Sequence, residues 1–284
     1  MTQVADLPPL RRLLDQYAIA PTKALGQNFL LDLNLTARIA RSAHPLEGCH
    51  VVEIGPGPGG LTRALLEAPL TSLTVIEKDQ RTAPLLTALS ETVEGREKGL
   101  RVRFDDALAV DLLTLLPAPR AVVANLPYNI ATPLLVQWLR DLWREPGAYR
   151  SLTLMFQREV VDRIVARPGE RAYGRLAVLT ALSTAAAYRQ FDVPAQAFTP
   201  PPKITSAIVR IDGRADTVPG PLSLFEAIES VTAAAFGQRR KMLRQSLKSV
   251  FPDPIAVLED LGLSPTARAE ELPPEAFLAL AQRR

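Results

Sequence analysis

The 284-residue sequence contains one cysteine, two histidines and no long uninterrupted apolar run. The single thiol, Cys49, can form neither an internal disulfide nor a cysteine-based zinc site. His44 and His50 have no acid or second cysteine at metal-ligand spacing, so we expect no metal, and histidine-led catalysis is poorly supplied. The longest uncharged stretch, residues 121–139, contains asparagines and prolines that a membrane-spanning helix tolerates poorly. These shortages exclude several common enzyme classes and any membrane span.

Acidic and basic side chains nearly balance, with 30 Asp and Glu against 33 Lys and Arg and a net charge of +3. Bulk charge therefore does not indicate nucleic-acid binding by itself. All but six of the cations are arginine, whose planar guanidinium suits phosphates and base edges, although a general arginine bias explains the same count. The first ten residues, MTQVADLPPL, lack the cationic start and apolar stretch of a secretion signal. We expect a cytoplasmic protein with no membrane partner.

Short β-branched runs alternate with amphipathic stretches from residue 50 onward. Strands are expected at 50–54, 73–77, 101–104, 121–124 and 152–156, and helices at 10–17, 61–67, 80–92, 133–143 and 157–167. This alternation predicts an α/β fold, a Rossmann-like and mostly parallel sheet with helices on both faces, which binds ligands at the carboxyl ends of its strands. Residues 212–221, rich in Gly, Pro and Asp, indicate a linker. We therefore expect a catalytic domain at 1–212 and a small all-helical domain at 213–284.

A glycine-rich turn, GPGPGG at residues 55–60, follows the first strand and leads directly into a helix. Glycine lets the backbone turn sharply and approach a ligand that a β-carbon would repel. Glu77 ends the second strand, where a carboxylate can accept hydrogen bonds from both hydroxyls of a ribose. These features indicate a nucleoside cofactor. Because Gly55, Gly57 and Gly60 also match the dinucleotide motif GxGxxG, NAD remains an alternative here.

Two further acids favour a different cofactor. Glu53 precedes the glycines at a position where dinucleotide folds usually carry an apolar residue. Asp106 follows the third strand, where its carboxylate can accept from the exocyclic amine of an adenine. A glycine loop, a ribose acid and an adenine acid at three successive strand ends are typical of methyltransferases that use S-adenosylmethionine.

The tetrapeptide Asn125-Leu126-Pro127-Tyr128 ends the fourth strand. An aromatic amine is a poor nucleophile because its lone pair is delocalised into the ring, so acceptors must hold the NH2 and aim its nitrogen. The side-chain oxygen of Asn125 and a backbone carbonyl held by Pro127 can supply them. Tyr128 can stack on a base that has left its helix. No strong general base is needed, because the methylated ammonium can lose its proton to water.

Together these segments resemble the ribosomal RNA adenine N6-dimethyltransferase family, and within it the bacterial small-subunit (16S) branch, whose loss gives kasugamycin resistance. Matching segments lie at 25–30 (LGQNFL), 53–62, 75–79, 106–107, 125–133, 172–176, 197–207 and 235–247. The resemblance implies dimethylation of two adjacent adenosines in the 3′-terminal hairpin loop of 16S rRNA, a step of ribosome biogenesis. It implies that S-adenosylmethionine is bound by Asn28, Leu30, Gly55, Glu77, Asp106 and Asn125, to which the glycine loop adds Gly57. It further implies that residues 125–128 hold the target amine and that Phe198 stacks on the base from the other side.

Two other segments agree with an RNA substrate. In FTPPPK at 198–203, a stiff polyproline stretch carries Phe198 and the cation Lys203. Residues 237–248 carry five cations and no acid, namely Arg239, Arg240, Lys241, Arg244 and Lys248. We expect one helix here that packs by its leucines and presents cations to phosphates, although an ordinary solvated helix face has the same pattern. Arg175 is a further candidate for the site entrance.

Three alternatives stay open. The large-subunit rRNA methyltransferases of the macrolide-resistance type share the Asn-Leu-Pro-Tyr chemistry, but the segments at 198–203 and 238–241 favour the small-subunit branch. A ribosome-assembly or RNA-chaperone role could accompany catalysis. An NAD-dependent oxidoreductase is the third. We expect the enzyme to act as a monomer.

Overall fold

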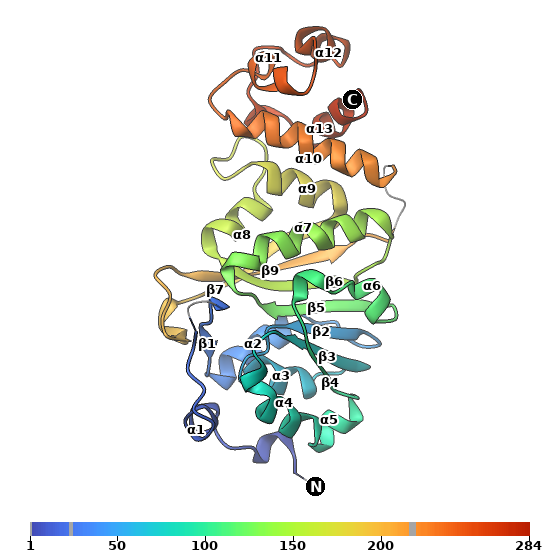
Figure 1. Ribbon diagram of the computed structural model, residues 1–284. Helices are drawn as coiled ribbons and strands as arrows, with labels where there is room; N and C mark the ends of the chain where they lie inside the picture. The colour runs from blue at the N-terminus through green and yellow to red at the C-terminus, as the bar shows by residue number, and fades with distance from the viewer. Residues whose placement is uncertain (1, 23–24, 216–219) are drawn as a thin grey trace.

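The computed structural model describes residues 2–22, 25–215 and 220–284, and within them seven strands form one twisted sheet (Figure 1). The strand order is β4-β3-β2-β5-β6-β9-β7. The first five, all parallel, are β2 (His50–Ile54), β3 (Ser72–Glu77), β4 (Arg101–Phe104), β5 (Arg120–Asn125) and β6 (Ser151–Gln157). They agree with the five predicted strands to within one residue at each end. The chain leaves β2 toward one edge and returns to its other side at β5, which creates a ligand-binding crevice at the carboxyl ends of these two strands.

Two antiparallel strands that the sequence did not predict complete the sheet. β9 (Ser206–Gly213) pairs with β6, and β7 (Thr184–Val193) pairs with β9 at the sheet edge. A second, two-stranded sheet joins β1 (Phe29–Leu30) to β8 (Phe198–Thr199). This small sheet brings two segments that are far apart in the sequence to the same end of β2 and β5.

Helices cover both faces of the sheet, as predicted. Val51 and Val123 point to one buried cluster with α2 (Leu33–Ser42), α3 (Gly60–Leu66) and α4 (Ala83–Ser90). Their neighbours on the same strands, Val52 and Val122, point to the opposite cluster with α7 (Tyr128–Arg144), α8 (Arg158–Val165) and α9 (Arg175–Ser183). Because neighbouring side chains of a strand face opposite sides, the β-branched runs can fill two cores at once.

Shorter elements connect these layers. They are η1 (Val4–Asp6), α1 (Leu10–Gln16), η3 (Gln80–Thr82), α5 (Val93–Glu97), η4 (Ala107–Ala109), α6 (Leu112–Leu115) and η5 (Ala195–Ala197). The helix predicted at 133–143 begins earlier, at Tyr128, and the carbonyl of Pro127, at its N-cap position, accepts from the N–H groups of Ile130 and Ala131. No helix among the described residues is long and apolar enough to cross a membrane.

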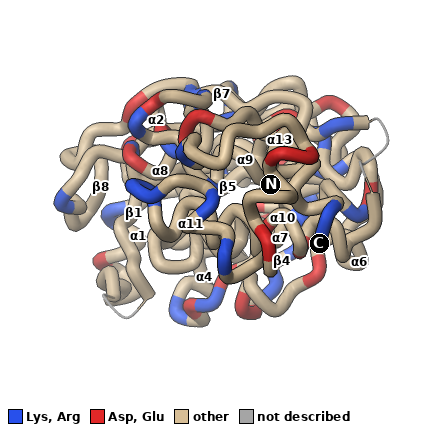
Figure 2. The backbone as a smooth tube through the Cα atoms, turned by 90° about the horizontal axis from the view of Figure 1, so that it is seen from above, with Lys and Arg blue, Asp and Glu red and all other residues tan. Residues whose placement is uncertain are grey.

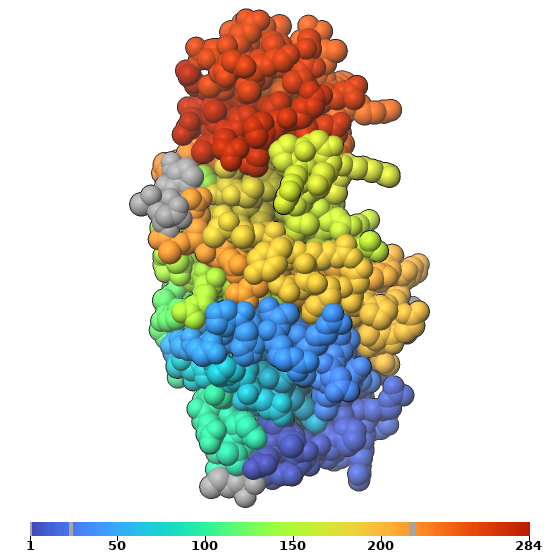
Figure 3. Space-filling view, turned by 180° about the vertical axis from the view of Figure 1, so that it is seen from behind, coloured from blue at the N-terminus to red at the C-terminus, as the bar shows by residue number. Residues whose placement is uncertain are grey.

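In its described residues, the C-terminal part is helical, as expected, and it lies at the end of the molecule away from the N-terminus (Figures 1 and 3). Its elements are α10 (Leu222–Gly237), α11 (Leu243–Ser246), η6 (Leu247–Ser249), α12 (Pro254–Asp260), η7 (Ala269–Glu271) and α13 (Pro274–Ala281). The Trp143 and Phe225 rings lie 5.6 Å apart, and the Tyr173 hydroxyl donates to the carbonyl of Leu272 at 2.9 Å. The buried apolar cluster of the α7–α9 layer therefore continues into the tail. Residues 216–219 of the predicted linker lie outside the described residues, and the two-domain division stays a prediction.

The single helix predicted at 237–248 is wrong. α10 ends at Gly237, and α11 starts only at Leu243, after a turn. The backbone N–H of Leu243 donates to the carbonyl of Ala267 at 2.8 Å, which draws the chain out of a continuing helix. Leu243 and Leu247 are buried, as expected, but the cations do not form one helical row.

Candidate active site

All eleven predicted cofactor and catalytic residues line one pocket at the carboxyl ends of β2, β3, β4 and β5. These residues are Asn28, Leu30, Gly55, Gly57, Glu77, Asp106, Asn125, Leu126, Pro127, Tyr128 and Phe198. Strand order alone explains most of this convergence, because parallel strands end at the same edge. The β1–β8 pair adds the remaining side of the pocket, since Leu30 lies opposite Phe198 in its register. Gln27, Phe29, Lys78 and Asn129 also line it; they lie in the segments 25–30, 75–79 and 125–133 that carry the resemblance, but no individual role was predicted for them.

The glycine loop needs its glycines for conformational reasons. Gly55 and Gly57 have φ angles of +67° and +54°, a region that residues with a β-carbon rarely adopt. A β-carbon on Gly57 would also lie 3.3 Å from the ring of Phe29. The backbone therefore forms a cradle that leaves room in front of its N–H groups.

Glu77 closes this cradle from the end of β3. Its Oε2 accepts from the backbone N–H of Gly57 at 2.9 Å, and its Oε1 accepts from the N–H of Asp79 at 2.8 Å. Burial raises the pKa of the Glu77 carboxyl, and the backbone N–H donors oppose that shift because they favour the ionised form. Each carboxylate oxygen has a second lone pair, so the oriented group can still accept from a ligand.

Glu53 lies on β2 beside the loop and is 1% exposed. Burial raises its pKa to about 8, and the hydroxyl of Thr62, which donates to Oε2 at 2.7 Å, lowers it only in part. This carboxyl is therefore largely protonated at neutral pH in the protein alone. A cationic ligand group placed against it would favour the ionised form.

Asp106 stands at the outer side of the pocket, after β4. Its Oδ1 accepts from the N–H of Leu108 at 3.0 Å, which fixes the side chain on the first turn of η4. Its Oδ2 accepts from Nζ of Lys78 at 2.8 Å, and this bond lowers the pKa of Asp106. The group is ionised and partly open to solvent, so its remaining lone pairs can accept from an exocyclic amine.

The tetrapeptide joins β5 to α7. Asn125 is the last residue of β5 and is half-buried, and Tyr128 is the first residue of α7. The hydroxyl of Tyr128 lies 2.7 Å from Oγ of Ser206 on β9, which fixes the ring orientation. Burial raises the pKa of this phenol, so it stays neutral. Ser206 belongs to a strand that the sequence did not predict, and no local signal could have found it.

Phe198 is 4% exposed and lines the same pocket. The prediction that a polyproline stretch displays it needs correction: its backbone lies in β8 and pairs with β1. Two-residue strands have no sequence pattern of their own, so this pairing was invisible. The backbone of Phe198 is therefore held beside that of Leu30.

The predicted RNA-binding cations lie outside the pocket lining. Arg240, Lys241, Lys248 and Lys203 are exposed, whereas Arg244 is half-buried. Arg239 donates from Nε to Glu270 at 2.8 Å. Figure 2 shows Lys and Arg distributed among Asp and Glu around the molecule.

Arg175, the candidate for the site entrance, has a different partner. It donates to Glu229 on α10 at 2.7 Å, and Arg140 of α7 donates to the same carboxylate at 2.6 Å. The pair of arginines thereby ties α7 and α9 to the C-terminal helices. Among the residues that the structure describes, no cluster of three His, Cys, Asp or Glu could hold a metal ion.

The fold and pocket define a class I methyltransferase. A dimethyladenosine transferase from Plasmodium falciparum has the same fold, with a TM-score of 0.72 and 24% identity over 88% of this chain and 94% of that chain. The 23S rRNA methyltransferase ErmE matches with a TM-score of 0.64 and 29% identity over 90% of this chain and 99% of that chain.

The chain belongs to the ribosomal RNA adenine dimethylase family, whose model matches residues 21–283. Similar proteins include the ribosomal RNA small subunit methyltransferase A of Azorhizobium caulinodans, 54% identical over 99% of this chain and 94% of that protein. The protein of the same name from Cereibacter sphaeroides is 51% identical over 100% of this chain and 99% of its own length.

Proposed function

We propose that this protein uses S-adenosylmethionine to dimethylate N6 of two adjacent adenosines in the 3′-terminal hairpin loop of 16S rRNA, during ribosome biogenesis. The observation that carries the proposal is the convergence of a glycine cradle, an oriented ribose acid and the Asn-Leu-Pro-Tyr turn in one pocket. The small-subunit substrate is supported by relatives with that printed name at 50–54% identity, against 29% for ErmE. Family membership also favours S-adenosylmethionine over the NAD that the glycine motif left open.

The residues present fit this cofactor. Glu77 would accept from the ribose hydroxyls, because backbone N–H groups already orient both of its oxygens. Asp106 would accept from the adenine amine. The glycine cradle would leave room for the part of the cofactor that lies between its adenine and methionine ends. Residues 25–30, here called the covering segment, line the pocket, and Asn28 and Leu30 on it would exclude water from the methionine end of the cofactor. When bound, the cofactor supplies an electrophilic methyl group on its sulfonium.

The chain's own residues prepare the acceptor nitrogen. Asn125 and the neighbouring backbone carbonyl would accept from the N6 hydrogens and direct the lone pair of the nitrogen toward the methyl carbon. Tyr128, oriented by Ser206, and Phe198, fixed by β1, would hold the flipped base on its two faces. Because the Tyr128 phenol stays neutral, it serves as a stacking surface, and the proton of the methylated ammonium leaves to solvent.

Exposed cations outside the pocket would grip the RNA. Arg240, Lys241 and Lys248 on the tail and Lys203 beside β8 are free to approach phosphates. Arg239 and Arg244 contribute less in this proposal, because Glu270 holds the first and the second is half-buried. The proposed substrate places the enzyme in the cytoplasm, where it would act as a monomer.

Methyl uptake by purified ribosomal subunits tests the proposal. Small and large subunits from a strain that lacks both methylations are incubated separately with the protein and labelled S-adenosylmethionine. We expect label in 16S rRNA at close to four methyl groups per small subunit, since two adenosines each receive two. Label in 23S rRNA alone would favour the macrolide-resistance alternative. No label in either would overturn the proposed activity.

A further inference from the structure

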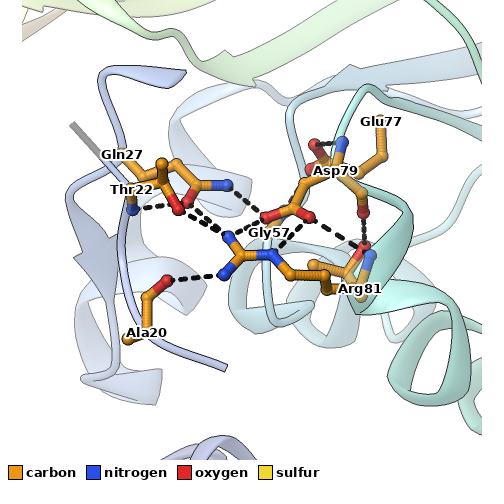
Figure 4. A network of polar contacts seen from close by, with 8 residues as sticks. Ala20, Thr22, Gln27, Gly57, Glu77, Asp79 and Arg81 are labelled. Atoms are coloured by element: carbon orange, nitrogen blue, oxygen red, sulfur yellow. Dashed lines mark hydrogen bonds and ion pairs between the residues drawn. The ribbon is translucent and has the colours of Figure 1, made fainter. Parts of the chain in front are cut away.

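One arginine ties the N-terminal segment to the turn after β3 (Figure 4). Arg81 donates from Nε and Nη2 to the two carboxylate oxygens of Asp79, at 2.8 and 2.6 Å. The same guanidinium donates to the carbonyl of Ala20 at 3.2 Å and to the hydroxyl of Thr22 at 2.8 Å. This is a bidentate ion pair with two additional bonds to a segment about 60 positions earlier in the chain.

Gln27 extends the same network to the pocket. Its Nε2 donates to Oδ2 of Asp79 at 2.9 Å, and its Oε1 accepts from the backbone N–H of Thr22 at 2.9 Å. Gln27 itself lines the pocket and directly precedes Asn28. Both ends of its amide are therefore occupied, which fixes the backbone on either side of it.

Asp79 also contacts the predicted ribose acid. Its backbone N–H donates to Oε1 of Glu77, whereas its carboxylate holds Arg81 and Gln27. A continuous set of hydrogen bonds thus runs from Glu77 to the segment that covers the pocket. Asp79 is 5% exposed, and the bonds from Arg81 and Gln27 lower its pKa, so the connecting carboxylate is ionised at neutral pH.

Among the described side chains of residues 25–28, that of Gln27 is the one with hydrogen bonds to a distant part of the chain. Phe29 and Leu30 are held at the end of this segment, because both side chains are buried and both residues pair with β8. The backbone N–H groups of Leu25 and Gln27 both donate to the carbonyl of Thr22, so these bonds are local. Burial and β8 therefore hold residues 29–30, whereas the position of Gln27 and Asn28 relative to Glu77 depends on the Arg81–Asp79–Gln27 network.

We propose that Asp79 and Arg81 are positioning residues for the cofactor, because they hold the segment 25–30 at its distance from Glu77 through Gln27. This inference rests on the proposed function, which assigns the pocket to S-adenosylmethionine. Neither residue is needed for the transfer step itself, since neither Asp79 nor Arg81 lines the pocket. A loosened network must therefore weaken cofactor binding without slowing transfer at saturating cofactor.

The full-length protein with Arg81→Met tests this directly, because methionine keeps an unbranched apolar stem and removes every donor. Calorimetric titration with S-adenosylhomocysteine measures the Kd, and steady-state methylation of small subunits gives kcat and the KM for S-adenosylmethionine. We expect Kd and KM to rise about 5- to 20-fold and kcat to stay within twofold. Arg81→Lys, which keeps the charge but loses the bidentate fork, should fall between Arg81→Met and wild type.

Two further variants separate positioning from general stability. Arg101→Met removes an exposed arginine from β4 outside the pocket and should bind like wild type. Gln27→Leu keeps the Arg81–Asp79 pair but breaks its link to the covering segment, and should raise Kd as Arg81→Met does. The melting temperature of the unliganded protein should change by a few degrees at most in all four variants.

The proposal is overturned if Arg81→Met binds S-adenosylhomocysteine within twofold of wild type, or if kcat falls while KM does not change. It is equally overturned if Gln27→Leu binds normally while Arg81→Met does not, because the effect then bypasses the covering segment. No binding by the wild-type protein would instead refute the proposed function, and this inference with it.

Discussion

Replacing Glu77 by glutamine removes one charge and one acceptor from the pocket without changing the size of the side chain. The carboxylate now accepts from two backbone N–H groups, those of Gly57 and Asp79. It has lone pairs left for two ribose hydroxyls. A glutamine keeps one oxygen, which can accept from only one side of this pair. Its NH2 group is a donor and would face the second backbone N–H, which is also a donor. One ribose hydroxyl therefore loses its acceptor.

The size of the effect follows from the lost hydrogen bond. A hydrogen bond to a charged group contributes about 1.5–3 kcal/mol. At about 1.4 kcal/mol for each factor of ten, the Kd for the cofactor should rise roughly 10- to 150-fold. The free energy of unfolding should change less, because glutamine also removes the desolvation cost that raises the pKa of Glu77.

Calorimetric titration of wild type, Glu77→Gln and Glu67→Gln with S-adenosylhomocysteine checks this expectation. Glu67 is an exposed acid just after α3, outside the pocket lining, and its variant should bind like wild type. A Kd for Glu77→Gln within threefold of wild type would refute the assignment of Glu77 to the ribose.

Three other expectations follow from the same pocket and surface. Asn125→Ala should lower the rate of methyl transfer by about a hundredfold or more, but weaken cofactor binding less than tenfold, because the proposed function assigns its main contact to the target amine. Glu53 has its folded-state pKa raised to about 8 from 4.5. The unfolded chain releases this proton first, so the stability of the protein alone should fall between about pH 4.5 and pH 8, and Glu53→Gln should remove much of this fall, on the order of a few kcal/mol. Replacing Arg240, Lys241 and Lys248 together by alanine should weaken binding to small subunits and reduce the slope of log K against log salt by up to about three.

Each of these has a result that would contradict it. Equal losses of activity and cofactor affinity in Asn125→Ala would assign this residue mainly to the cofactor. Chemical denaturation across the pH range tests the expectation for Glu53, which is contradicted if wild type and Glu53→Gln lose stability in parallel as the pH rises. Filter binding at several salt concentrations tests the triple alanine variant. An unchanged slope of log K against log salt would show that the three cations do not contact the RNA.

The sequence was sufficient for the parallel half of the fold and for most of the pocket. Four of the five parallel strands, β2 to β5, end at the glycines, Glu77, Asp106 or Asn125, and short apolar runs mark where these strands lie. Local patterns of this kind survive folding because parallel strands are buried on both faces. The residues predicted at the strand ends therefore lie together.

Pairings between distant segments could not be predicted from such patterns. β7 is an edge strand with exposed positions and small residues, and β1 and β8 have two residues each. The cation spacing at 240–248 fits a helix. In the structure the Leu243 N–H donates to the carbonyl of Ala267 instead of to a helical partner, so the helix is interrupted there. The contacts of Arg81 with Ala20 and Thr22 are likewise set by the tertiary fold.

Nucleoside mass spectrometry of rRNA tests the central claim most directly. Unmodified small subunits are incubated with S-adenosylmethionine and either wild-type protein or Asn125→Ala, and the 16S rRNA is digested and mapped. The account predicts N6,N6-dimethyladenosine at two neighbouring positions near the 3′ end with wild type, and unmodified adenosines with the variant. Methyl groups on another base, on another atom of adenine, or equally abundant with Asn125→Ala would contradict it.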